Sequence, residues 1–296
     1  MGLKILSCFD GISCGQQALK RIGKHYDMYY ASEIHQPSID VTQYRFPNTI
    51  QVGDIKNIDA EKFKDVNVII GGSPCQGFSM AGKRKGMVTV EHLEITTLEQ
   101  YMELKNDGFQ FDGQSYLFWE FIRLIKEIKP KYFFLENVRT KKKWMDIISE
   151  SIGVEPIRFN SSLVSAQFRE RYYWTNIPIK PVVDKQILLK HIIPGAVGCG
   201  YRGRRNRQNP FDKKYYKIFT VNKKGKANCI VTNSGNTNLY MVDGEVHKMT
   251  PEHAERLQTI DVGYTNISGI SNSNRYKMIG NAWTVDVITE FFKNLI

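Results

Sequence analysis

The chain has 296 residues, of which 42% are hydrophobic, and its 41 Lys and Arg exceed its 30 Asp and Glu to give a net charge of +11. This length and balance predict a globular protein with one large domain, or one large and one small domain, and the charge suits a polyanionic partner. No apolar run approaches the ~20 residues that cross a bilayer, and the start MGLKILSCFD lacks the parts of a signal peptide, so we expect a cytoplasmic protein without membrane contact.

The cysteines argue against both a disulfide framework and a zinc site. They are odd in number, widely scattered and without a CxxC pair, so we expect reduced thiols and no metal. The five are Cys8, Cys14, Cys75, Cys199 and Cys229.

The first half of the chain alternates short β-branched or aromatic runs with helical patterns. This alternation predicts βαβ units around a parallel sheet. The alternating runs are 4–9, 14–22, 26–34 and 37–46, and further strands are expected at 67–72, 131–137 and 171–177.

The clearest helix is predicted over 116–128, where apolar residues recur at helical spacing and indicate core packing. Another helix ends the chain after Arg275. The stripe of the first helix consists of Leu117, Phe118, Phe121, Ile122, Ile125 and Ile128.

The composition changes after Pro178, and residues 180 to 262 are expected to be irregular. Between Arg202 and Lys226 there are ten Lys or Arg against a single acid, Asp212. A charge run is usually a solvated face, but interleaved aromatic residues favour a binding surface here. The aromatic residues are Tyr201, Phe211, Tyr215, Tyr216 and Phe219.

The first predicted strand ends in SCFDGISCG, a glycine-containing turn that opens a helix. Such a turn brings backbone N–H groups and a helix N-terminus close to a ligand, although many α/β proteins carry glycines there. Glu33 and Asp54 then follow the next two strands. They are candidates to accept hydrogen bonds from a nucleoside cofactor, and helix capping is the alternative for each.

The segment GGSPCQGFS follows the apolar run at 67–72 and places Cys75 on a loop at the carboxyl edge of the sheet. Open α/β sheets bind ligands at that edge. Pro74 fixes the backbone before the thiol, and the flanking glycines permit close approach of another molecule. Catalysis would require a helix N-terminus or a cation to lower the thiol pKa.

Glu136 ends another apolar strand, where a carboxyl group is costly unless it is paired or used in chemistry. Gln167, Arg169 and Arg171 alternate in the period of a strand, so their side chains are expected on one face. A plain Glu–Arg ion pair is the alternative, and three polar groups on an aromatic strand favour a site.

The ordered motifs FDGISCG, GGSPCQGFS, FFLENV, QFRER and GNAWTV resemble the signature series of cytosine-C5 DNA methyltransferases. The resemblance covers residues 3 to 178 and 250 to 296. The forms SCFDGIS, SAQFRERYYWTNIP and GYTNISG are most similar to the Dnmt3-like branch of bacterial or phage type. The resemblance implies a Rossmann-like, doubly wound, mostly parallel sheet with S-adenosylmethionine as the cofactor and a small inserted target-recognition domain.

The resemblance also assigns roles to residues. Cys75 would attack C6 of a flipped-out cytosine, Glu136 would contact N3, Arg171 would hold O2, and Arg169 belongs to the same catalytic set. The cofactor positions that it implies are Phe9, Asp10, Gly11, Ile12, Gly15, Glu33, Ile34, Asp54, Ile55, Pro74, Asn281, Trp283 and Thr284.

The domain boundaries and the DNA contacts follow from the same resemblance. The catalytic domain is predicted at 1–178 and 263–296, and the recognition domain at 179–262. The segment 87–114 is longer than the family leads us to expect, and we interpret it as an extension of the loop that closes over DNA. The expected DNA-binding residues are Gln76, Ser79, Lys83, Arg84, Arg202, Arg204, Arg205, Lys213, Lys214, Lys223 and Lys224.

Two other functions compete with a DNA methyltransferase. A transfer-RNA cytosine methyltransferase has the same fold, and a DNA-binding regulator could keep the cofactor fold without turnover. The GGSPCQGFS form and the separate basic region favour double-stranded DNA as the partner. We expect a monomer, with a dimer as the alternative, in a bacterial cell or phage-infected host near the nucleoid, and a cognate restriction endonuclease is an open partner.

Overall fold

The structure is a computed structural model that describes residues 2–74, 86–205, 215–222, 224–232 and 238–295, without the side chains of 202–205 and 215–218. The chain divides into two compact units. Unit 1 consists of Met1–Phe159, Glu170–Lys180 and Thr289–Ile296, and unit 2 consists of Asn160–Arg169 and Pro181–Ile288.

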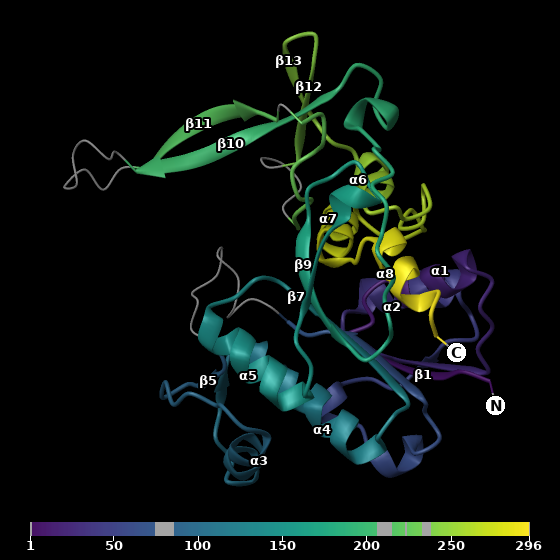
Figure 1. The fold of residues 1–296 in the computed structure, drawn as a ribbon, viewed down its shortest axis with the longest axis vertical. Coiled ribbons are helices and arrows are strands. Elements are labelled where there is room, and N and C mark those ends of the chain that lie inside the picture. The colour runs from purple at the N-terminus through teal and green to yellow at the C-terminus, as the bar shows by residue number, and fades with distance from the viewer. Residues whose placement is uncertain (1, 75–85, 206–214, 223, 233–237, 296) are drawn as a thin grey trace. The chain divides into compact units, whose positions relative to one another are not determined.

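A seven-stranded sheet forms the centre of unit 1, in the order β3-β2-β1-β4-β7-β9-β8 (Figure 1). Strands β3, β2, β1, β4 and β7 pair in parallel, and β9 runs antiparallel to β7. The predicted mostly parallel, doubly wound sheet is therefore confirmed. Its strands are β1 (Lys4–Cys8), β2 (Met28–Ser32), β3 (Ile50–Gln51), β4 (Val68–Gly72), β7 (Tyr132–Asn137), β8 (Ile157–Asn160) and β9 (Glu170–Thr175).

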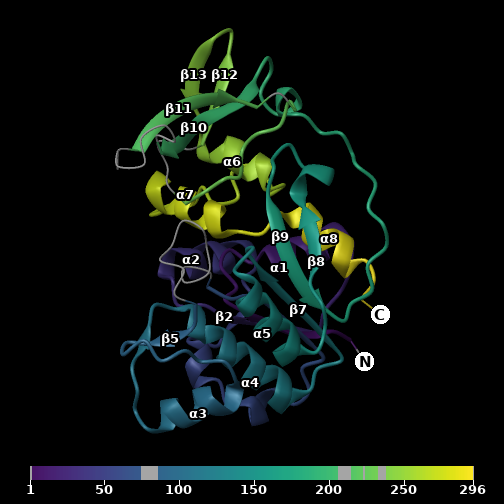
Figure 2. The ribbon, with the colours of Figure 1, turned by 60° about the vertical axis from the view of Figure 1, so that its left-hand side comes forward.

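Helices cover both faces of this sheet because its strands alternate apolar side chains on both sides. Leu6, Ile69 and Leu135 belong to one core cluster with helix α4, while Ile70 lies close to Gly15 at the start of α1. Figure 2 shows α4 and α5 on one face and α1 on the other. The α-helices around this sheet are α1 (Cys14–Arg21), α2 (Gln36–Arg45), α4 (Phe118–Ile128), α5 (Lys142–Ile152) and the last turn of α8 (Val285–Phe292), and unit 1 also contains α3 (Leu98–Asn106).

Helix α4 shows how directly the sequence pattern determines local structure. Its stripe residues Phe118, Phe121 and Ile122 are buried, as the helical spacing predicts. The helix ends at Ile128 because Lys129 adopts a left-handed conformation (φ 56°) and Pro130 follows it.

The strand order reverses direction at β1, because the chain continues to β2 and β3 on one side and to β4 and β7 on the other. Open sheets of this kind bind ligands at such a switch point, beyond the carboxyl ends of the strands. The turn after β1, which carries the predicted cofactor motif, and the end of β4, which leads into the predicted nucleophile motif, flank this point.

The segment expected to extend a DNA-closing loop is a folded part of unit 1. It contains a two-stranded sheet of β5 (Val88–Thr89) and β6 (Phe111–Asp112), and helix α3 (Leu98–Asn106). Met87, Ile95 and Tyr101 are buried in the core cluster that includes α4. Apolar burial therefore holds this segment on the catalytic unit.

Unit 2 contains a four-stranded antiparallel sheet in the order β11-β10-β12-β13, so the expectation of an irregular region was wrong. The glycine and asparagine residues led to the prediction of an irregular region. The β-branched and aromatic residues between them nevertheless satisfy a strand pattern. The strands are β10 (Val197–Arg205), β11 (Tyr215–Val221), β12 (Leu239–Val242) and β13 (Glu245–Lys248).

Unit 2 also contains α6 (Pro251–Leu257), α7 (Asn272–Asn281) and the first turn of α8. A fully buried carboxylate, Glu255, accepts from the backbone of Gly263 and Thr265 and pairs with Arg275 of α7. Residues 263–288 thus pack within unit 2, whereas the prediction assigned them to the catalytic domain. The functional extent of each domain stays a prediction.

Candidate active site

The turn after β1 carries three residues in left-handed backbone conformations: Phe9 (φ 57°), Gly11 (φ 59°) and Ser13 (φ 56°). Such conformations are costly for residues other than glycine and persist only where the surroundings enforce them, often at functional sites. The Gly11 N–H donates to Glu33 Oε2 at 2.8 Å, which ties this turn to the end of β2. The predicted cofactor turn is therefore a strained, fixed loop.

Asp54 acts as a helix cap, as the alternative interpretation held, whereas Glu33 binds backbone N–H groups ahead of α2 without capping the helix. Glu33 Oε1 accepts from the N–H groups of Ile34 and His35 just before α2. Asp54 accepts from Lys56 N–H at 3.0 Å and pairs with Lys56 Nζ at 3.1 Å, capping the 3-10 helix η1 (Ile55–Asn57). Capping does not exclude ligand binding, because a carboxylate has acceptor capacity for several donors.

The structure brings these acceptors together at one edge of the sheet. Cys8 pairs in register with Ser32, and Ser32 Oγ donates to Gly53 O at 2.7 Å, so the ends of β1, β2 and β3 are joined. Ile12 and Ile55 are buried, and a Cβ on Gly15 would lie 2.7 Å from Ile70 and from the Tyr29 hydroxyl. These three predicted positions shape the turn through packing.

Asp10 and Ile34 meet the requirements of a ligand with a cationic group and an apolar surface. Within the described part of the chain, Asp10 Oδ2 is buried and accepts no hydrogen bond, while Oδ1 accepts from Tyr29. Ile34 is 64% exposed although it is apolar and borders this turn. The edge therefore fits S-adenosylmethionine, which has an ammonium, a sulfonium and an adenine ring for these groups to meet.

Glu136 and Arg171 form an ion pair between neighbouring strands. Arg171 Nε lies 3.0 Å from Glu136 Oε1, and the two side chains are 17% and 12% exposed. Glu136 also stands opposite Gly72 in the β4–β7 register, so it lies beside the segment that leads into the nucleophile motif. The pair is thus partly accessible at the same sheet edge.

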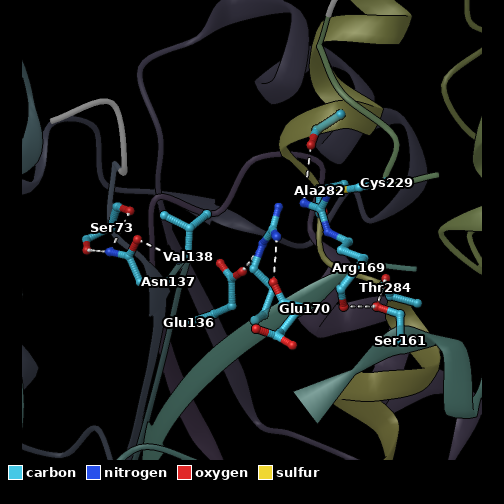
Figure 3. A network of polar contacts seen from close by, with 12 residues as sticks. Ser73, Glu136, Asn137, Val138, Ser161, Arg169, Glu170, Cys229, Ala282 and Thr284 are labelled. Atoms are coloured by element: carbon cyan, nitrogen blue, oxygen red, sulfur yellow. Dashed lines mark hydrogen bonds and ion pairs between the residues drawn. The ribbon is translucent and has the colours of Figure 1, made fainter. Parts of the chain in front are cut away.

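Asn137 and Ser73 fix the backbone at the start of the nucleophile motif (Figure 3). The buried Asn137 amide donates to Ser73 Oγ at 2.9 Å and to Ser73 O at 3.4 Å. Pro74 follows directly. Sequence reasoning missed this pair, although the EN and SP dipeptides at the ends of paired strands were a usable signal.

The predicted nucleophile Cys75 lies outside the described residues, as do Gln76, Ser79, Lys83 and Arg84. The other four cysteines have structural surroundings. Cys8, Cys14 and Cys199 are buried, and burial raises the thiol pKa of Cys8 and of Cys199. Cys229 is half-buried, and its Sγ lies 3.4 Å from Arg169 Nη1.

The expectation that Gln167, Arg169 and Arg171 project from one strand face was wrong. Strand β9 begins at Glu170, and Gln167 and Arg169 belong to unit 2. Arg169 is 4% exposed and donates to the carbonyls of Ile230 and Gly280. It also donates to the Ala282 carbonyl (Figure 3). The turn after α7 leaves buried carbonyl groups that need donors, and the Arg169 side chain supplies them. It therefore does not project from a strand face together with Arg171.

The GNAWTV turn lies within unit 2, and its predicted cofactor residues differ in accessibility. The Thr284 hydroxyl is buried between Ser161 Oγ and Gln258 Oε1, at 3.0 and 2.8 Å. Asn281 is exposed and Trp283 is half-buried. Thr284 therefore stabilises the turn itself.

Most of the predicted DNA-binding side chains lie outside the described part of the chain. Arg202, Arg204 and Arg205 lie on β10, but their side chains are outside the described part, and Lys213, Lys214 and Lys223 are outside it altogether. Lys224 is exposed, with its Nζ 5.8 Å from the Phe168 ring centroid. Lys226, at the end of the basic stretch, is buried and donates to Ser162 O and Ser165 O, so it supports a turn within unit 2.

The described ranges contain neither a metal-binding cluster nor a membrane-spanning helix. No cluster of three or more His, Cys, Asp or Glu side chains there could hold a metal ion. Across the same ranges, no helix is both long and apolar enough to cross a membrane.

Comparison with known proteins identifies relatives of this chain. A model of the family described as C-5 cytosine-specific DNA methylase matches residues 3–101, 103–145 and 169–296. The orphan methyltransferase M.Rho11sI of Bacillus phage rho11s is 30% identical over 184 residues, which cover 58% of this chain and 32% of that protein. M.SPBetaI of Bacillus phage SPbeta is 29% identical over 207 residues, or 62% of this chain and 47% of that protein. The chain thus spans between about a third and a half of the length of these relatives.

Solved structures share the fold. A putative DNA modification methyltransferase encoded within an E. coli prophage gives a TM-score of 0.63 at 18% identity and covers 99% of both chains. A mutant of DNMT2 from Spodoptera frugiperda gives 0.62 at 18% identity over 98% of both chains. At these identities the likeness concerns the fold alone.

Asp10 provides a pH-dependent test of the site. Burial raises the pKa of Asp10 to about 6 from its ordinary 3.8, although hydrogen bonds from Ser7, Tyr29 and Ser13 oppose this. Between about pH 4 and 6 the folded state then binds more protons, so stability contributed by this group is lost as pH rises. Asp10→Asn should therefore gain stability relative to the wild type across this range, measured by urea unfolding at several pH values. If the difference in unfolding free energy between Asp10→Asn and the wild type did not change with pH, the raised pKa of Asp10 would be contradicted.

Proposed function

The chain belongs to the C-5 cytosine-specific DNA methylase family, and we propose that it transfers a methyl group from S-adenosylmethionine to C5 of a flipped-out cytosine in duplex DNA. The observation that carries the proposal is the register of β4 and β7. It sets Gly72, three residues before Cys75, opposite Glu136, whose partner Arg171 lies on the next strand.

Cys75 is the proposed nucleophile. Its thiolate forms the Sγ–C6 bond, which breaks the C5–C6 double bond and makes C5 electron-rich. The bound S-adenosylmethionine supplies the methyl group that C5 takes. Loss of the C5 proton to a base and cleavage of the Sγ–C6 bond then restore the C5–C6 double bond and the Cys75 thiolate. The burial of Cys8, Cys14 and Cys199 argues against those three thiols as the nucleophile, and Cys229 is half-buried beside Arg169.

Glu136 and Arg171 are the proposed partners of the cytosine ring. N3 of cytosine is bonded to C2, the ring atom that carries O2. Two side chains already in contact at 3.0 Å can therefore reach both N3 and O2. A hydrogen bond donated to N3 by the protonated carboxyl group of Glu136 disperses the negative charge that develops on attack at C6, and the Arg171 guanidinium stabilises O2. We assign Arg169 the different task of positioning the turn at 280–282, in line with its contacts to the Gly280 and Ala282 carbonyls.

The cofactor is proposed to lie along the edge formed by the turn after β1 and the ends of β2 and β3. Asp10, Glu33 and Asp54 provide carboxylates for its ammonium and ribose hydroxyl groups, and Ile34 provides an apolar contact. Pro74, Asn281, Trp283 and Thr284 complete the set that the family resemblance implies.

Recognition of DNA is proposed for residues 179–262, with a catalytic domain at 1–178 and 263–296. Support comes from the antiparallel sheet in that range and from its basic stretch. Membership of the Dnmt3-like branch, a cytoplasmic location, a monomer and a companion restriction endonuclease are finer proposals that rest on the sequence.

The first experiment is methyl transfer with labelled S-adenosylmethionine to duplex DNA and, in parallel, to transfer RNA, with bisulfite sequencing of the product. The wild type should label cytosine C5 in duplex DNA, and Cys75→Ala should abolish transfer while keeping DNA and cofactor affinity, because flipping and binding do not require the sulfur. Transfer to RNA alone, or none to either, would reject the proposal.

A second prediction concerns the Asn137–Ser73 pair. Asn137→Ala should lower kcat by roughly tenfold to a hundredfold and leave KM for DNA and cofactor near the wild-type values, since misplacing a nucleophile by about 1 Å can have this effect. Asn176→Ala is the matched control, because Asn176 bonds Phe133 N and Lys131 O near the start of β7. Equal losses in both variants would mean that Asn137 only stabilises the sheet.

A further inference from the structure

Helix α3 of the inserted segment contributes two donors to a buried carboxylate on α4. Glu120 is fully buried, and it accepts from the Tyr101 hydroxyl at 2.6 Å, from Lys105 Nζ at 2.6 Å and from Arg123 Nε at 2.7 Å. A buried carboxylate is costly unless its acceptor sites are filled. The inserted segment is therefore needed to satisfy Glu120.

Arg123 extends this network to the turn that follows β3. While Nε binds Glu120, Nη2 donates to Ile58 O at 3.1 Å and lies 3.4 Å from Ile55 O. Nη1 donates to Glu127 at 2.8 Å. The guanidinium is buried, so these carbonyls have a charged donor in a region that excludes water.

The carbonyls that Arg123 binds belong to the segment that presents Asp54. Asp54 caps η1 through Lys56 N–H, and Ile55 opens η1. Within the turn, Asn57 N–H donates to Asp54 O at 2.9 Å and Ile58 N–H donates to Ile55 O at 3.3 Å. The orientation of the Asp54 carboxylate thus depends on the short helix η1, and the Arg123 guanidinium binds the carbonyl groups of Ile55 and Ile58 at its two ends.

We propose that Glu120 and Arg123 are positioning residues for the cofactor-binding turn at Asp54–Ile55, and that the inserted segment supports cofactor binding by holding Glu120 through Tyr101 and Lys105. The inference rests on the proposed function for the identity of the cofactor. It assigns the segment to the cofactor side of the enzyme, in place of the DNA-closing role expected from its length. A turn that is ordered before binding loses less entropy when the ligand binds.

The test measures the dissociation constant of S-adenosylhomocysteine by calorimetry. Arg123→Lys keeps a cation near Glu120 but cannot bridge to both carbonyls, and the double variant Tyr101→Phe, Lys105→Met removes both donors of α3. Each should weaken binding by about fivefold or more. Glu99→Gln is the matched control, because the exposed Lys126–Glu99 pair at 3.6 Å joins α3 to α4 without touching Glu120. It should stay within about twofold of the wild type.

Amide hydrogen exchange gives a second readout that needs no cofactor. Opening of the turn should speed exchange of the Asn57 and Ile58 amides in Arg123→Lys, while the Asp10 amide, bonded to Ser32 O at 3.1 Å, should be unchanged. Uniformly faster exchange would indicate a general loss of stability and would count against positioning.

The outcomes separate the two proposals. A wild type that binds S-adenosylhomocysteine, with Asp54→Ala weakened and Arg123→Lys unchanged, overturns this inference and leaves the proposed function standing. A wild type that does not bind overturns both. Weakened duplex DNA binding with an unchanged cofactor constant in the double variant would restore the DNA-closing role.

Discussion

The parallel register of β1, β4 and β7 is the constraint on which the site depends. Cys8 pairs with Gly71, and Gly72 pairs with Glu136, so three strand ends reach the same edge of the sheet. One edge can therefore hold a nucleoside cofactor on the β1 side of the switch point and a base on the β4 side. A slip of one residue between β4 and β7 would turn Glu136 to the opposite face of the sheet relative to β4 and end its alignment with Gly72.

Buried and half-buried ion pairs fix the positions of side chains in unit 1, at a cost in folding stability. Glu136 with Arg171, and Glu120 with Arg123, each bring a carboxylate out of water, which pays off only when the remaining acceptor sites are also satisfied. Around Glu120 all the described donors are structural. At Glu136 the side chain is still 12% exposed, which leaves access for a substrate. The two pairs thus have similar chemistry and different tasks.

Local patterns predicted unit 1 well, because apolar runs such as Val68–Gly72 and the stripe of α4 are dictated by burial. The carboxylates Glu33, Asp54 and Glu136 were predicted as site candidates because each lies at or shortly after the end of a strand. Contacts between distant segments were not predictable in this way. The alternation of Gln167, Arg169 and Arg171 predicted a shared strand face, but Arg169 instead donates to three carbonyls from distant segments. Lys226, which ends the basic stretch predicted as a binding surface, is buried. The antiparallel sheet of unit 2 was missed because glycine and charge masked its alternation.

The central claim is that the Cys75 thiol attacks the base, while Glu136 and Arg171 bind the cytosine ring. The most direct measurement is mass spectrometry of the protein after reaction with S-adenosylmethionine and duplex DNA that contains 5-fluorocytosine at the target position. Fluorine cannot leave C5 as a proton does, so the covalent adduct should accumulate on the peptide that contains Cys75 and be absent from Cys75→Ala. An adduct on a peptide containing Cys8, Cys14 or Cys229, or one that persists in the alanine variant, would contradict the account.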